Sequence, residues 1–114
     1  MAKVKVKEIN LERGYPTVDM ALREMVSQLG TYKRQDYRAI ILVHGYGSSG
    51  SGGKIKIAVK SKLRENSLSG IVRKFCGGEE WINHKREMLD VCNQLRDFES
   101  RISGNPGVTV VILK

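Results

Sequence analysis

The stretch ILVHGYGSSGSGGKIK, residues 41–56, holds the residue types of this chain that are best suited to chemistry. A short apolar run ends at His44, a segment rich in glycine and serine follows, and lysines begin at Lys54. An imidazole titrates near neutral pH, so His44 could serve as a general base. The backbone N–H groups of a glycine-rich turn that enters a helix bind anions, and lysines add positive charge. The stretch therefore predicts an anion site beside a histidine.

The specific phosphate-binding motifs fit this loop poorly. The P-loop pattern GxxxxGK[ST] fails because Ser48 stands at its first glycine and because isoleucine follows the lysine. The dinucleotide pattern GxGxxG matches at Gly45, Gly47 and Gly50, but 114 residues are too few for a full dinucleotide-binding fold. At this point a general phosphate cradle and a surface loop without a ligand both stay open.

The net charge of the chain favours an acidic partner. The chain has 20 Lys and Arg residues against 12 Asp and Glu residues, which gives +8 at pH 7. Six acidic and three basic residues between positions 79 and 99 give that segment a charge of −3, so the remainder carries +11. Such an excess describes partners rather than fold, and nucleic acid is the commonest acidic partner.

Length and composition exclude several other classes of protein. No stretch approaches the roughly 18 apolar residues of a membrane span, and the start MAKVKVKEIN lacks the apolar centre of a signal peptide. The two cysteines, Cys76 and Cys92, have neither a CxxC spacing nor the spacing of a zinc site. We therefore expect one cytoplasmic domain over residues 1–114, with buried reduced thiols and no membrane association.

Four strands are predicted, at residues 3–11, 38–44, 69–76 and 108–114. The second contains the unbroken apolar run AIILV, which is typical of a strand covered on both faces. In the first strand the alternation changes phase between Val6 and Ile9, which predicts a bulge or two short pieces.

Apolar residues at helical spacing predict three helices, at residues 17–30, 54–65 and 80–102. Thr17 is the expected N-cap of the first helix and Gly30 its end. The second helix carries five bases and no acid before its last residue. The order β-α-β-α-β-α-β predicts an α/β two-layer sandwich, a mixed four-stranded sheet with helices packed on it, plus an added acidic helix.

Three stretches resemble the small MutS-related (Smr) domain family. HGYG at residues 44–47 resembles its HGxG motif at a strand end, GYPTVDMAL at 14–22 its first turn and helix, and NPGVTVVILK at 105–114 its closing strand. Ile55 and Lys56 stand where the family has a Leu-Arg pair, after a slightly longer loop. The resemblance covers about residues 8–75 and 105–114, so residues 79–103 are interpreted as an inserted helix.

The resemblance implies a core similar to the C-terminal domain of a bacterial translation initiation factor, and it implies binding of DNA or RNA. Many Smr domains also cleave nucleic acid as endonucleases. The loop would then hold backbone phosphate and His44 would lie beside it. The residues expected to contact phosphate are Gly45, Tyr46, Gly47, Ser48, Gly50, Lys54, Lys56, Lys60 and Arg13.

The first strand departs from the pattern of the catalytic family members. They carry Leu-Asp-Leu-His-Gly, whereas this chain has INLERG at residues 9–14, with Asn10 and Glu12 at the acid and histidine positions. Residues two apart on a strand point to the same side, so both could face the loop. Asn10 is no base, and Glu12 is a carboxylate at pH 7 that repels phosphate unless a metal or Arg13 intervenes.

Several alternatives stay open from the sequence. His44 could be a general base acting with Glu12 and Asn10, a phosphate contact, or a purely structural residue. No metal site is predicted, although a nuclease could use a divalent cation, Mg²⁺ or Mn²⁺. The alternative function is a protein-interaction module in which segment 79–103 docks a basic partner or a second copy of the chain. The other histidine, His84, is expected to be a solvated helix residue.

Overall fold

Four strands form one mixed sheet in the computed structural model, which describes residues 4–14, 16–45 and 52–114. The strands are β1 (Val6–Asn10), β2 (Ala39–Val43), β3 (Val72–Gly77) and β4 (Val108–Leu113). Their order across the sheet is β1-β2-β4-β3. β1 and β2 are parallel, whereas β4 runs antiparallel to both of its neighbours. The predicted mixed four-stranded sheet is therefore confirmed.

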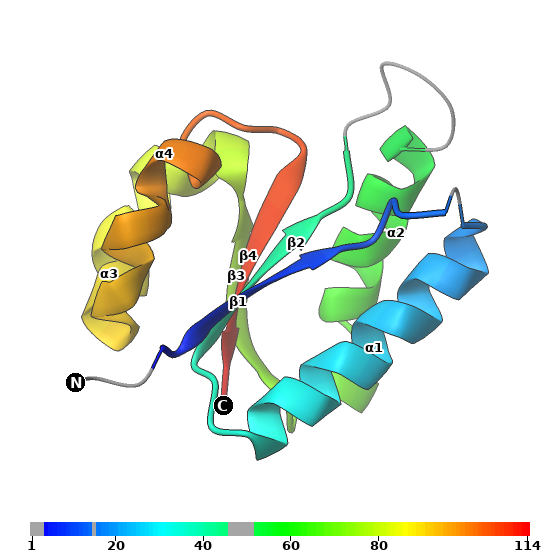
Figure 1. Cartoon of the computed structure of the whole chain (residues 1–114), viewed down its shortest axis with the longest axis horizontal. Coiled ribbons are helices and arrows are strands. Elements are labelled where there is room, and N and C mark those ends of the chain that lie inside the picture. Colours follow the sequence, from blue (N-terminus) through cyan, green and yellow to red (C-terminus); the bar gives the residue numbers. More distant parts are fainter. Residues whose placement is uncertain (1–3, 15, 46–51) are drawn as a thin grey trace.

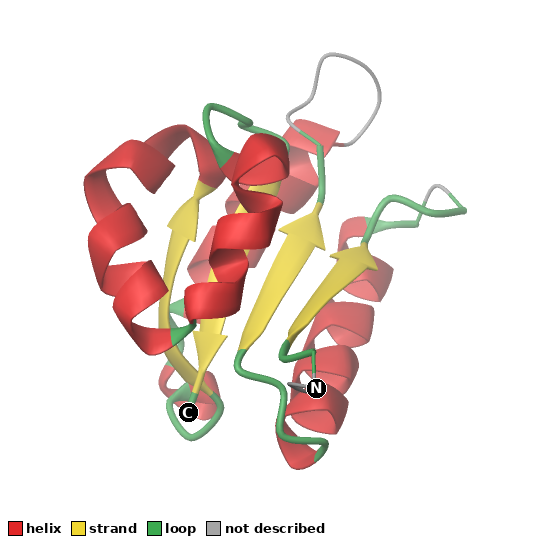
Figure 2. Ribbon diagram, turned by 60° about the vertical axis from the view of Figure 1, so that its left-hand side comes forward, coloured by secondary structure: helices red, strands yellow, loops and turns green. Residues whose placement is uncertain are grey.

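Helices cover both faces of this sheet (Figure 1). The long helices α1 (Val18–Arg34) and α2 (Gly52–Leu63) lie on one face. The segment between β3 and β4 lies on the other face and contains α3 (Trp81–Val91) and α4 (Glu99–Ile102). Short 3-10 turns at Asn66–Leu68, Gly78–Glu80 and Asn93–Phe98 connect these elements. The sheet with α1 and α2 is the predicted two-layer unit, and the segment between β3 and β4 forms a further layer (Figure 2).

The sheet separates two apolar cores. Ile40 and Leu42 of β2 pack with the buried residues of α1 and α2, such as Met25 and Val59. The neighbouring β2 residue Ile41 belongs to a second cluster, with Trp81 and other residues from the segment between β3 and β4. Since successive residues of a strand point to opposite faces, a strand between two cores must be apolar at every position. This explains the unbroken run AIILV.

β1 contains no bulge, so this prediction is wrong. Its register with β2 runs without a shift from the Val6–Ala39 pair to the Asn10–Val43 pair. Val6 packs in the core beneath α3 and α4, while Ile9 packs in the core beneath α1 and α2. The alternation changes phase because different β1 residues are buried on the two faces of one regular strand. The register shift of this sheet lies in β3 instead, between Val72 and Lys74.

The first helix begins as predicted but does not end at Gly30. The hydroxyl oxygen of Thr17 accepts a hydrogen bond from the backbone N–H of Met20 at 3.1 Å, which caps the first turn. α1 then continues through Gly30 to Arg34. A glycine inside a helix costs about 1 kcal/mol relative to alanine. The added turn offsets this cost because Tyr32 packs against the core and basic residues suit the C-terminal end of the helix dipole.

The predicted single helix over residues 80–102 is wrong, because the chain reverses within it. α3 ends at Val91, Cys92 is extended, and the chain returns through the 3-10 turn and α4. One straight helix over this range would be about 34 Å long. A six-residue strand such as β4 spans only about 20 Å. The reversal keeps the apolar residues of both halves, among them Met88, Leu95 and Ile102, on the sheet.

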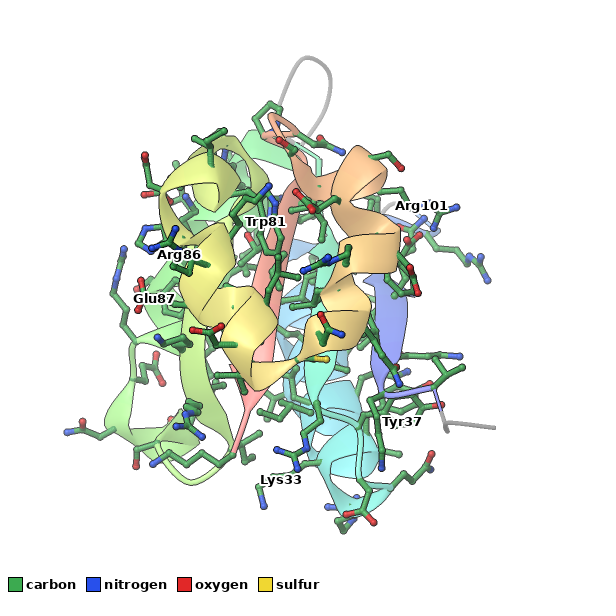
Figure 3. All side chains as sticks on the ribbon, turned by 90° about the vertical axis from the view of Figure 1, so that its left-hand side faces the viewer. Lys33, Tyr37, Trp81, Arg86, Glu87 and Arg101 are labelled. Atoms are coloured by element: carbon green, nitrogen blue, oxygen red, sulfur yellow. The ribbon has the colours of Figure 1, made fainter. Side chains whose placement is uncertain are left out.

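A polar contact holds the two halves of this layer together. The indole N–H of Trp81 donates to a carboxylate oxygen of Glu99 at 3.1 Å, and the ammonium group of Lys85 donates to the same oxygen at 3.0 Å. Figure 3 looks onto the layer and shows Trp81 between the two halves. Its side chain is fully buried, so Trp81 is a core residue.

Candidate functional site

The HGYG motif begins at the end of the sheet where β1 and β2 finish and β4 starts. Backbone hydrogen bonds hold the three segments together beyond the strands. The N–H of Leu11 donates to the carbonyl of Val43 at 2.8 Å. The N–H groups of His44 and Gly45 both donate to the carbonyl of Gly107, at 2.9 and 3.0 Å. The motif is thus attached to β4 as well as to the end of its own strand.

His44 is enclosed, with both of its ring nitrogens hydrogen-bonded. Its side chain is fully buried. Nδ1 lies 2.6 Å from the carbonyl oxygen of Gly45, and Nε2 lies 2.7 Å from the hydroxyl oxygen of Thr109. A carbonyl only accepts, so Nδ1 carries the proton and Nε2 of the neutral ring accepts from the Thr109 hydroxyl. Both ring nitrogens of His44 are therefore occupied by partners from the same chain.

The environment of His44 keeps its ring neutral. Burial lowers the pKa of His44, and the hydrogen bond to the Gly45 carbonyl opposes this effect. The positive charges of Lys56 and Lys60 lower the pKa further, while the negative charge of Glu79 raises it. These charged groups therefore lie near the motif, although they come from α2 and from the turn after β3.

Gly45 provides a close approach between the motif and Glu12. Its φ angle is +73°, a conformation that residues with a side chain rarely adopt. A Cβ atom on Gly45 would overlap the carboxylate of Glu12. The fold therefore brings the carboxylate of Glu12 next to Gly45 of the HGYG motif.

Asn10 and Arg13 lie elsewhere around the end of β1. The side-chain oxygen of Asn10 accepts from the backbone N–H of Glu12 at 2.8 Å and shapes the turn after the strand. Asn10 and Arg13 also line a groove of about 550 Å³ along β1 and α1, together with Glu24 and Gln28. A role of Asn10 in chemistry would compete with this turn contact.

The predicted phosphate-binding lysines are not equally available. Lys54 is exposed at the start of α2. Lys56 donates a hydrogen bond to Glu79, and the ammonium group of Lys60 lies 3.6 Å from the carboxylate of Glu80. The remaining predicted residues, Tyr46, Gly47, Ser48 and Gly50, lie outside the described residues.

Sequence reasoning missed the residues that hold and neutralise this site. Thr109 is the one polar residue in the buried strand VTVVIL, and this pattern could have marked it as a partner for a buried polar group. Glu79 and Glu80 belong to the acidic segment, and the sequence gives no sign of their contact with α2. These contacts join residues about 20 positions apart, and no local pattern reveals them.

The described residues contain no group of three or more His, Cys, Asp or Glu side chains that could hold a metal ion. His84 lies on the surface of α3, with Nδ1 3.6 Å from the carboxylate of Glu87, as expected for a helix surface residue. Both cysteines are buried and unpaired, and burial raises the pKa of Cys76 to about 12. Within the described part of the chain, no helix is both long and apolar enough to cross a membrane.

Comparison with known proteins gives an informative structural similarity. No family model matches the sequence, and no curated protein matches it. The structure is similar to the crystal structure of the Smr domain of Thermus thermophilus MutS2, with a TM-score of 0.60 and 26% sequence identity. The similarity covers 95% of this chain and 98% of that chain.

Proposed function

We propose that this chain, which is an Smr-like domain, binds the sugar–phosphate backbone of nucleic acid at the edge of the sheet around the HGYG motif. The observation that carries the proposal is the position of Lys56 and Lys60. They lie on successive turns of α2, near enough to His44 for their charges to lower its pKa. Two lysines of α2 therefore lie near His44, in the described part of the HGYG motif.

The charge of α2 supports backbone contact rather than recognition of base sequence. Its described residues include Lys54, Lys56, Lys60 and Lys62 and no acidic residue. Lysine binds phosphate as a point charge, and phosphate contacts supply affinity without reading sequence. We expect the affinity to fall steeply as the salt concentration rises, because each neutralised phosphate releases counterions.

We propose that the chain, in the conformation with His44 enclosed, binds nucleic acid and does not cleave it. A general base needs a free lone pair within reach of the proton that it removes. In His44 the Nε2 lone pair accepts from Thr109, and the side chain is fully buried. Endonuclease activity would require this contact to open and His44 to reach the scissile group.

The internal pairing of segment 79–103 weighs against docking of a basic protein partner. Four of its six acidic residues already pair with bases of the same chain. Glu79 and Glu80 pair with the lysines of α2, Glu87 with Lys74, and Glu99 with Lys85. Little of the acidic charge is left for a partner, so nucleic-acid binding is the function that we favour.

The test measures binding and cleavage of labelled single-stranded RNA, duplex DNA and branched DNA on one gel, with and without Mg²⁺ or Mn²⁺. Lys54→Ala removes an exposed charge beside the loop. Lys114→Ala removes an exposed charge after the far end of β4, and therefore controls for net charge. We expect Lys54→Ala to weaken binding and to reduce the salt slope by about one.

Equal effects of the two lysine variants would contradict a binding site at this edge. Cleavage by the wild-type protein that a folded His44→Gln variant loses would overturn the proposal of binding without cleavage. Circular dichroism would show whether His44→Gln is folded.

A further inference from the structure

Glu79 holds the two lysines that the proposed function assigns to phosphate. Its carboxylate accepts a hydrogen bond from Lys56 through one oxygen. The other oxygen lies 3.9 Å from the ammonium group of Lys60, which also lies 3.6 Å from Glu80. Glu79 comes from the 3-10 turn Gly78–Glu80 that follows β3. An acidic residue of the segment between β3 and β4 therefore reaches across to the basic helix α2 on the other face.

The position of this carboxylate depends on a glycine. A Cβ atom on Gly77 would overlap Oε1 of Glu79, so the side chain folds back over the end of β3. The dihedral angles of Gly77, φ −71° and ψ 155°, are ordinary extended values that any residue adopts. The glycine at this position therefore leaves room for Glu79 and is not required by the backbone conformation.

Glu79 is ionised in this position. Partial burial opposes ionisation, but the hydrogen bond from Lys56 and the positive charge of Lys60 outweigh burial and hold the pKa of Glu79 below its usual value. A carboxylate between two lysines presents the same chemistry as one phosphate group, namely oxygen atoms that share a negative charge and accept from ammonium groups.

We propose that Lys56 and Lys60 form a site for one phosphate group and that Glu79 occupies this site until a backbone phosphate of nucleic acid displaces it. The inference rests on the proposed function and adds a competitor that belongs to the protein itself. Exchange is feasible because ion pairs at a protein surface contribute little stability, whereas a polyanion gains affinity from many phosphates at once. Glu79 would then set the affinity and disfavour isolated weak anions.

The main test compares two variants that each remove one negative charge from the same segment. Glu79→Gln removes the proposed competitor. Glu87→Gln is the control, because Glu87 pairs with Lys74 of β3 rather than with α2. Affinity for labelled single-stranded RNA is measured by fluorescence anisotropy at fixed salt. We expect Glu79→Gln to bind roughly threefold to tenfold more tightly than Glu87→Gln.

A third variant displaces Glu79 without a change of charge. Gly77→Ala places a methyl group where the Glu79 carboxylate now lies, while the other close atom, the ammonium nitrogen of Lys60, ends a flexible side chain. We expect Gly77→Ala to bind RNA more tightly than the wild type at an unchanged net charge. Equal affinities of Gly77→Ala and the wild type, together with equal affinities of Glu79→Gln and Glu87→Gln, would overturn the inference and leave the proposed function standing.

A second readout separates the inference from the proposed function. Thermal unfolding is followed with increasing inorganic tripolyphosphate, which carries phosphate groups without any nucleoside. Tighter binding of tripolyphosphate by Glu79→Gln than by Glu87→Gln, without RNA or DNA binding by any variant, would support the phosphate site and refute nucleic-acid binding. If neither ligand distinguishes the two variants, Glu79 does not compete for an anion.

Discussion

The two faces of the sheet are covered by layers of different construction. On one face, α1 and α2 are long, regular helices, and α2 is basic throughout. On the other face, α3, a 3-10 turn and α4 form a short reversing segment with a net charge of −3 between residues 79 and 99. Both layers nevertheless bury a complete apolar cluster against the same strands.

This difference shows what a stripe of apolar residues specifies. The stripe fixes which side chains are buried, because burial removes apolar surface from water wherever the backbone permits it. It does not fix the continuity of the helix that carries those side chains. α1 and α2 each carry their apolar stripe on one continuous helix. The segment between β3 and β4, the acidic layer, folds back because the sheet is too short for one long helix.

The charged residues of the two layers meet where β3 ends. The pair of Lys56 with Glu79 joins α2 to the turn before α3, and it does so beside the His44 motif. The opposite charges of the two layers therefore form an ion pair beside the candidate site.

The largest expected effect is a loss of stability in two core variants, which test whether the two layers contribute comparably to stability. Met25 of α1 and Met88 of α3 are at most 1% exposed, one in each core. Each change to alanine removes buried apolar atoms and leaves a cavity, so we expect a loss of about 2–5 kcal/mol in the free energy of unfolding for either variant. Urea unfolding, followed by circular dichroism, measures both.

A much smaller loss for Met88→Ala would break this comparison. If that variant lost less than about 1 kcal/mol and unfolded in two steps, the acidic layer would be a separate, weakly attached unit. A single transition in both variants, with similar losses, would mean that the two layers unfold together.

A smaller loss of stability is expected from a change at Gly78, where the acidic layer packs closely against the chain that leads into β4. A Cβ atom on Gly78 would overlap the carbonyl oxygens of Asn105 and Ile102, which are backbone atoms and cannot move freely. We expect Gly78→Ala to lower the free energy of unfolding by about 1–3 kcal/mol, because the close contact forces the backbone to shift. Gly70→Ala is the control, since a Cβ there has no atom within 4 Å. Equal stabilities of the two variants would mean that the approach at Gly78 is not tight.

The smallest effect concerns pH and distinguishes the two histidines. Because burial lowers the pKa of His44 in the folded state, the unfolded chain binds this proton more tightly than the folded chain. The associated stability is complete above about pH 6.5 and is lost as the pH falls through the folded-state pKa, with a slope of at most about 1.4 kcal/mol per pH unit. Urea unfolding between pH 7.5 and pH 5 measures this slope.

Two variants show which residue produces the slope. We expect His44→Gln to remove the pH dependence in this range, whereas His84→Gln should retain it because His84 lies on the surface of α3. A slope that persists in His44→Gln would contradict the neutral, buried ring.

Part of the candidate site followed from the sequence, for a physical reason. The HGYG motif comes directly after a buried strand, so His44 had to lie where the strands end, and Glu12 follows two residues after the parallel neighbour β1 ends at Asn10. The carboxyl ends of parallel neighbours meet at one edge, which brought Glu12 to Gly45. The partner of the histidine could not be predicted in this way, because Thr109 belongs to a strand inserted from the far end of the chain.

The sequence by itself determined the four strands and the first two helices, because local periodicity records which side chains are buried and glycine, proline and capping residues mark many of the ends. It predicted the order of these elements, the cap at Thr17 and the basic character of α2. The tertiary structure alone decided that residues 80–102 reverse, that β4 lies between β2 and β3, and that Glu79 pairs with Lys56. These features depend on the size of the sheet and on contacts between distant residues, which no local pattern contains.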